Sequence, residues 1–126
     1  MTDTVTLAFP ARTQNVSLAR TVTAVMAARA DFPLDQLEDV RLAVDEAVSQ
    51  LIADAPPGSE ITCAFRILDA GLDIVLTAPS ASGQVPPTGT FSWTVLTALV
   101  DSVTATVDDG TATMGLHVDR AVPVDV

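Results

Sequence analysis

The chain has 126 residues, with six basic and sixteen acidic side chains and a formal net charge of −10. Its length fits a single domain, since compact domains most often contain roughly 100–150 residues. Because 48% of the residues are hydrophobic and only 17% are charged, intrinsic disorder is excluded. The acidic excess disfavours direct contact with nucleic acid or an anionic membrane and favours a basic partner.

The remaining composition argues against several further classes of protein. No apolar run approaches the roughly 18 residues of a membrane span, and the N-terminus lacks the basic-then-apolar pattern of a signal peptide, so we expect a cytoplasmic protein. Cys63 is the sole cysteine, which excludes an intramolecular disulfide and a cysteine-based zinc site. No P-loop, dinucleotide-binding, nucleophile-elbow or HExxH motif occurs.

The first half of the chain predicts one strand followed by two helices. Apolar residues alternate over 5–9, as in a half-buried strand that Pro10 ends. A helix is expected next, capped by Asn15 or Ser17 and ending at Arg29. A second helix follows Pro33 and runs through Ile52, with an apolar stripe at helical spacing.

The second half predicts four strands and one helix. Residues 60–68 and 72–76 form strand-like runs around a short hairpin connection, and residues 78–89 are expected to form an uncharged loop. A helical pattern covers 91–100. Strands at 103–107 and 113–118 then flank Asp109-Gly110, a hairpin turn signal.

The predicted order of elements is therefore β, α, α, β, β, α, β, β. Hairpin strands interrupted by helices indicate an α/β fold of the α+β kind. We expect a two-layer sandwich with a mixed, mostly antiparallel sheet and helices packed on one face. The domain should span residues 1–120, followed by a frayed tail over 121–126.

Glu46 and Gln50 are the most informative polar pair. They lie four residues apart on the second helix and project away from its apolar stripe. Together a carboxylate and an amide could hold magnesium through oxygen ligands, or the carboxylate could act as a general base. The alternative is a solvated polar face with a hydrogen-bonded helical pair.

Three further side chains have structural interpretations. His117 has no second histidine beside it and is expected to be structural. Cys63 is expected to be a small buried residue and not a nucleophile. Trp93 is interpreted as core filler, with an anchor for a partner protein as the alternative.

Four segments form an ordered set of motifs: the strand with Leu7 and Phe9, the stretch 14–20, the helix 42–50 and the run 91–101. Together they resemble the RsbW-type anti-sigma factors of bacteria, which are serine-protein kinases with the Bergerat ATP-binding fold, and the run 91–101 looks like the equivalent helix of mycobacterial-type anti-sigma factors. It covers both ends of the chain, and only the middle loop diverges.

The resemblance implies a protein that sequesters an alternative sigma factor, is released by an anti-anti-sigma partner and forms homodimers. It places Arg20 on the partner-contacting surface, together with Asn15 and Ser17, and it implies that Glu46 is the base in phosphotransfer. Half of the sixteen acidic residues lie between Asp31 and Glu60, so we expect an electronegative surface around the second helix.

The nucleotide-binding residues depart from the family pattern. Gln50 replaces the family's magnesium-binding asparagine and is one methylene longer. The adenine-reading Asp-x-Gly-x-Gly motif falls on 77–81, which begins with Thr77 and has no glycine, and the second glycine box is reduced to Gly89. No lysine or arginine occurs from Ile67 to Asp119.

We therefore expect no bound cofactor and no metal. ATP and magnesium are implied by the resemblance alone, and they would meet Glu46, Gln50, Thr77 and Gly89, with Gln50 on the metal. Three hypotheses remain open: an anti-sigma factor that acts by sequestration with a degenerate ATP site, an active serine kinase, and a module that binds a protein other than a sigma factor.

Overall fold

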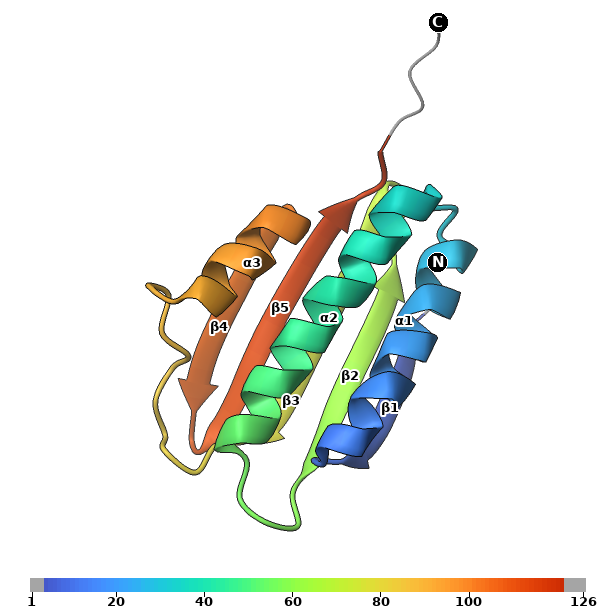
Figure 1. Ribbon diagram of the computed structural model, residues 1–126. Helices are drawn as coiled ribbons and strands as arrows, with labels where there is room; N and C mark the ends of the chain where they lie inside the picture. The colour runs from blue at the N-terminus through green and yellow to red at the C-terminus, as the bar shows by residue number, and fades with distance from the viewer. Residues whose placement is uncertain (1–3, 122–126) are drawn as a thin grey trace, which may run out of the picture.

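The computed structural model describes residues 4–121 as one antiparallel sheet covered on one face by helices (Figure 1). Of the tail expected at 121–126, residues 122–126 lie outside the described residues. Within residues 4–121, no helix is both long enough and apolar enough to cross a bilayer. The elements are β1 (Thr4–Pro10), the short helix η1 (Thr13–Asn15), α1 (Val16–Arg29), α2 (Leu34–Asp54), β2 (Glu60–Ile67), β3 (Gly71–Pro79), α3 (Phe91–Leu99), β4 (Ser102–Asp108) and β5 (Thr111–Asp119).

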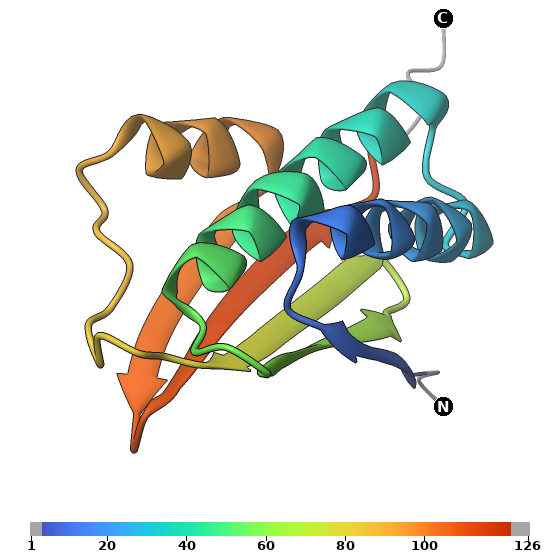
Figure 2. The same cartoon turned by 60° about the horizontal axis from the view of Figure 1, so that its bottom comes forward.

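The sheet has the strand order β1-β2-β3-β5-β4, and the element order and two-layer sandwich expected from the sequence are confirmed. Every pair of neighbouring strands within residues 4–121 is antiparallel, so this part of the sheet contains none of the parallel pairs of a mixed sheet. The segment with α3 carries the chain past the position of β5 to the edge strand β4, and β5 then fills the gap by a hairpin. Figure 2 shows all three helices on the same side of the sheet.

The core lies between the helices and one face of the sheet. Its largest fully buried side chains include Phe65 on β2, Ile74 on β3 and Met114 on β5. They meet an apolar face of α2 formed by Val40, Val44 and Val48, which are all 0% exposed. Because strand side chains alternate, the opposite face of β2, β3 and β5 carries the less buried residues.

The helix boundaries follow local backbone signals. Asp31 has φ of 61° and turns the chain between α1 and α2, and Pro33 occupies the N-cap position of α2. Asn15 is the N-cap residue of α1 but makes no side-chain cap; its Nδ2 donates instead to the Pro10 carbonyl at 2.9 Å. Ser17 lies within the first turn of α1. α2 extends to Asp54, two residues beyond the expected end.

The strand β3 is longer than expected, because the predicted loop included two residues that are extended. Ala78 and Pro79 continue the strand and pair with Ala112 and Thr111 of β5. Proline is tolerated there because it lies at the end of the strand. The irregular segment therefore begins at Ser80, next to the C-terminus of α2, and this placement matters for the site described below.

Candidate functional site

Glu46 and Gln50 lie on the face of α2 that meets α3. The hydroxyl of Ser92, in the first turn of α3, donates a hydrogen bond to Oε1 of Glu46 and accepts one from Nε2 of Gln50. All three side chains are partly buried. The carboxylate and the amide are therefore joined through a serine from a different helix, 42 residues further along the chain from Gln50.

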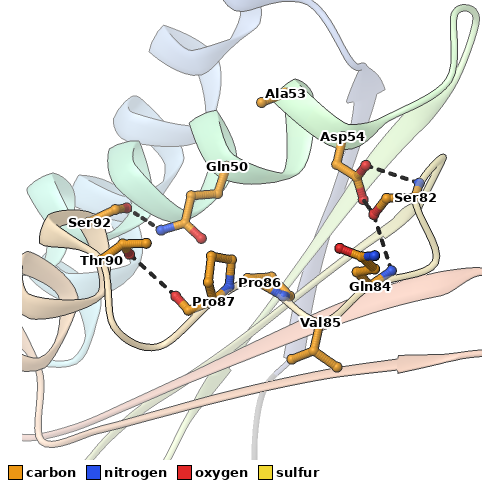
Figure 3. Close-up of a pocket in the computed structure, with 10 residues that line it drawn as sticks. All are labelled: Gln50, Ala53, Asp54, Ser82, Gln84, Val85, Pro86, Pro87, Thr90 and Ser92. Atoms are coloured by element: carbon orange, nitrogen blue, oxygen red, sulfur yellow. Dashed lines mark hydrogen bonds between the residues drawn. The ribbon is translucent and has the colours of Figure 1, made fainter.

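A cavity of about 290 Å³ opens beside this network (Figure 3). Its walls come from the C-terminal half of α2, the segment after β3 and the start of α3. All the lining residues are apolar or neutral except Asp54, which carries a charge. The lining consists of Gln50, Ala53, Asp54, Ser82, Gln84, Val85, Pro86, Pro87, Thr90 and Ser92.

Asp54 holds the segment after β3 at the other end of the cavity. Its Oδ2 accepts hydrogen bonds from the hydroxyls of Ser80 at 2.5 Å and Ser82 at 3.0 Å, and its Oδ1 accepts from the Ser82 amide at 3.1 Å. These bonds, led by that from Ser80, lower the pKa of Asp54 against the opposing effect of desolvation. The carboxylate is thus fixed as an anion that organises the loop.

Arg20 lies on α1, which runs beside α2 (Figure 1). Its Nε donates to Oδ1 of Asp45 on α2 at 2.9 Å, and its side chain is still 41% exposed. A hollow of about 190 Å³ next to it is lined by Arg20, Glu38, Arg41, Leu42 and Asp45. Leu42 is 53% exposed, so this surface combines charged groups with an apolar side chain.

His117 lies on the opposite side of the molecule, on the face of the sheet without helices. Its Nδ1 lies 2.5 Å from Asp73 and its Nε2 lies 2.9 Å from Asp119. The hydrogen bond to Asp73, followed by that to Asp119, raises the pKa of His117. Within residues 4–121 no group of His, Cys, Asp and Glu side chains has an arrangement that could hold a metal ion.

Cys63 and Trp93 agree with their structural interpretations. Cys63 is 0% exposed, and burial raises the pKa of its thiol to about 12, so it is not a nucleophile at neutral pH. Trp93 is partly buried and packs against the hydrophobic core.

The fold and the arrangement of polar residues can be compared with known proteins. The model for the histidine kinase-like ATPase domain matches residues 9–117, which is most of the chain. The chain belongs to this family. Its five-stranded sheet and the helices on one face agree with the resemblance to the Bergerat fold.

Curated relatives of this ATPase-like domain are anti-sigma factors and related kinases. The anti-sigma-F factor RsbW of Mycobacterium tuberculosis is 38% identical over 96 residues, covering 74% of this chain and 55% of that protein. The serine-protein kinase RsbW of Listeria innocua is 35% identical over 77 residues, covering 59% of this chain and 49% of the kinase. The chain therefore spans about half the length of these relatives.

A solved structure confirms the fold. The RsbU and RsbW domains of a Mycobacterium tuberculosis protein align with a TM-score of 0.72, covering 96% of this chain and 33% of that one. The sequence identity is 14%, so this likeness concerns the fold alone.

An ATPase-like domain implies a magnesium nucleotide, and the residues around the cavity can be tested for their fit to one. No arginine, lysine or histidine lines the cavity, so a triphosphate would meet no cationic side chain there. Oε1 of Glu46 and Nε2 of Gln50 are both engaged by Ser92. This lining does not fit a magnesium triphosphate, because it offers no positive charge to neutralise the phosphates.

The structure brings together some of the expected site residues and separates others. Gln50 lines the cavity, and Glu46 is bonded to the cavity residue Ser92. Thr77 and Gly89 do not line it. Thr77 lies between the buried residues Leu76 and Ala78 of β3, so its side chain points away from the helical layer.

Sequence reasoning missed the roles of Ser92 and Asp54. Ser92 lies 46 residues from Glu46, and no local spacing relates two helices that meet only in the folded chain. A weak signal did exist for Asp54, because it follows Glu46 and Gln50 at intervals of four residues on the same helix. Ser80 and Ser82 fall in the predicted loop, and the sequence gives no sign that their hydroxyls bind Asp54.

Proposed function

We propose that this domain is an anti-sigma regulator that sequesters an alternative sigma factor without needing a nucleotide. The observation that carries the proposal is the internal network of Glu46, Ser92 and Gln50 beside a cavity without cationic residues. Glu46 and Gln50, which would serve phosphotransfer, are both bonded to Ser92, and no cationic side chain lines the cavity to hold phosphates, which favours stoichiometric binding over catalysis. The similarity to RsbW anti-sigma factors supports the choice of partner.

The proposed partner surface is the outer face of α1 and the adjoining face of α2. Arg20 belongs to it, with Asn15 and Ser17 at the start of α1. Arginine is frequently a hot spot in protein interfaces because its planar guanidinium makes several directed hydrogen bonds. Exposed acidic residues such as Asp35 and Asp39 on α2 would attract the basic surface that a sigma factor presents to DNA.

A titration of the purified domain against its sigma factor, with and without magnesium and ATP, tests this proposal. We expect the same dissociation constant in both conditions, together with inhibition of transcription in proportion to the amount of domain added. A strict requirement for ATP would overturn the nucleotide-independent mechanism, and an absence of binding to any sigma factor would overturn the choice of partner.

An active serine kinase is the second candidate function. It is favoured by one observation, namely that the Glu46 carboxylate accepts a hydrogen bond from a serine hydroxyl, the arrangement that a general base needs. The acceptor would be a serine on an anti-anti-sigma protein. Calorimetry with ATP and magnesium discriminates, because micromolar affinity corresponds to about 8 kcal/mol of binding that sequestration does not require.

The remaining assignments follow from the same proposal. Release by an anti-anti-sigma partner and assembly into a homodimer are proposed from the resemblance to RsbW proteins, and a regulator of RNA polymerase would act in the cytoplasm. Light scattering at several concentrations measures the oligomeric state. Affinity capture from the native host, followed by mass spectrometry, distinguishes a sigma factor from a different protein partner.

A further inference from the structure

We propose that Ser92 is a positioning residue that fastens the segment 80–92 to α2 at one end of the cavity. The inference deepens the proposed function and rests on it for its biological meaning, because Ser92 engages the carboxylate and the amide that a nucleotide site of this family would use. The two hydrogen bonds of Ser92 and the stripe of polar residues on α2 support it.

The first step concerns the spacing of polar residues on α2. Glu46, Gln50 and Asp54 follow one another at intervals of four and therefore lie along one side of the helix. All three bind the segment that covers the cavity. Glu46 and Gln50 bind Ser92 at its end, and Asp54 binds the serines at 80 and 82 at its beginning.

The second step concerns what lies between these two attachments. Residues 81–85 and 87–89 are exposed, and Pro86 and Pro87 limit the hydrogen bonds that the backbone can donate. The Thr90 hydroxyl accepts a hydrogen bond from the Trp93 amide and so caps α3, but this bond is local to the start of α3 and does not reach α2. The segment is therefore attached to α2 at its two ends, by Asp54 at the start and by Gln50 at the end (Figure 3).

The third step concerns how α3 is otherwise held. It has nine residues, Leu96 is its only buried one, and Trp93 and Leu99 pack partly buried against the core. A helix this short has little intrinsic stability and depends on its contacts with neighbouring elements. Ser92 donates one hydrogen bond to the Glu46 carboxylate and accepts another from the Gln50 amide. These two bonds therefore supply much of the polar contact between the first turn of α3 and α2.

The network also explains why Gln50 is compatible with this site. A longer amide side chain displaces its polar atoms from the place where an asparagine would put them, and here its Nε2 reaches Ser92 on the neighbouring helix. The side chain thus acts as a donor between helices. In this arrangement Ser92 acts through its bonds to Glu46 and Gln50.

Hydrogen exchange measured by mass spectrometry on the whole chain tests the inference. Ser92→Ala removes both bonds, so we expect the opening equilibrium of the bonded amides of α3, over residues 93–99, to increase about tenfold to a hundredfold, the range for loss of a hydrogen bond to a charged group. Ser92→Thr keeps the hydroxyl and should restore most of the protection. Thr97→Ala is the matched control, because the Thr97 hydroxyl binds only the Thr94 carbonyl of its own helix.

The fluorescence of Trp93 gives a second measurement. Trp93 is the sole tryptophan and adjoins Ser92, so Ser92→Ala should shift its emission to longer wavelength, whereas Thr97→Ala should not. Should Ser92→Ala fail to fold, Gln50→Ala removes one of the two bonds and should show a smaller change of the same kind. Unchanged exchange and unchanged emission in the folded variants would overturn the inference.

The outcome separates this inference from the proposed function. Loss of protection in Ser92→Ala, combined with no binding of a sigma factor by any variant, would support the role of Ser92 and refute the proposed partner. Nucleotide-independent sigma binding, combined with unchanged exchange in Ser92→Ala, would refute the role of Ser92 and support the proposed function.

Discussion

Replacing Arg20 by alanine should weaken partner binding far more than it weakens the fold. Arg20 makes one ion pair, in which its Nε lies 2.9 Å from Asp45. The two side chains are 41% and 25% exposed, so solvent screens their attraction. Such pairs contribute about 0.2–1 kcal/mol to stability, a small part of the roughly 5–15 kcal/mol that stabilises a domain of this size.

The expected loss in binding is larger because an interface arginine is desolvated by its partner. Hot-spot residues cost about 2 kcal/mol or more when truncated, which corresponds to a roughly 30-fold rise in the dissociation constant. Arg20→Lys should fall between the wild type and Arg20→Ala, because lysine retains the charge but not the planar fork of donors.

Two measurements on the same preparations check this prediction. Urea denaturation gives the free energy of unfolding, and calorimetric titration with the sigma factor gives the dissociation constant. Arg29→Ala is the matched control, since it removes an exposed arginine from the last turn of the same helix. It alters the net charge equally and should leave binding within about threefold of wild type if the effect of Arg20 comes from its contact and not from net charge.

Two results would refute the reasoning. If Arg20→Ala binds the sigma factor as tightly as the wild type, the outer face of α1 is not the partner surface. If the variant loses several kcal/mol of stability, the ion pair with Asp45 is a structural requirement that solvent does not screen.

Three further predictions concern the rest of the fold. A Cβ atom at Gly71 would lie 2.2 Å from the Val118 carbonyl oxygen, so Gly71→Ala should lower the free energy of unfolding by about 3 kcal/mol in urea denaturation; an unchanged midpoint would contradict the close approach. The pKa of His117 is raised, chiefly by Asp73, so its contribution to stability is fully present below the unfolded pKa of about 6.5 and is lost as pH rises through the folded pKa. The stability difference between wild type and His117→Gln should therefore shrink from pH 5.5 to pH 8.5, and a constant difference would oppose this assignment. Cys63, with a pKa of about 12, should react with a thiol reagent at pH 8 only after unfolding, and rapid labelling of the native protein would contradict its burial.

Much of the fold could be predicted from sequence because its signals are local. The α2 stripe of Val40, Val44 and Val48 repeats at helical spacing, and alternation along β5 marks its buried face. Asp109 and Gly110 both have positive φ, as a type I′ hairpin turn requires, and the Asp-Gly pair predicts that turn from the sequence. Each of these features depends on neighbours within a few residues.

The end of β3 shows where local signals fail. Proline and serine after Thr77 favour a loop, yet Ala78 and Pro79 are held in the sheet by pairing with Ala112 and Thr111 of β5. That pairing joins residues more than thirty positions apart in the chain. The tertiary arrangement therefore overrides the turn propensity of the sequence at this boundary.

The sequence by itself determined that Glu46 and Gln50 share one side of a helix, because helical geometry relates residues four apart. It also supported the family resemblance that the ATPase-like domain model confirms. What these side chains bind was decided only when α3 packed against α2 and placed Ser92 between them. Hydrogen bonds act over a few ångströms in space. For residues more than forty positions apart, the sequence does not give the distance between their side chains, which is set only when the chain folds.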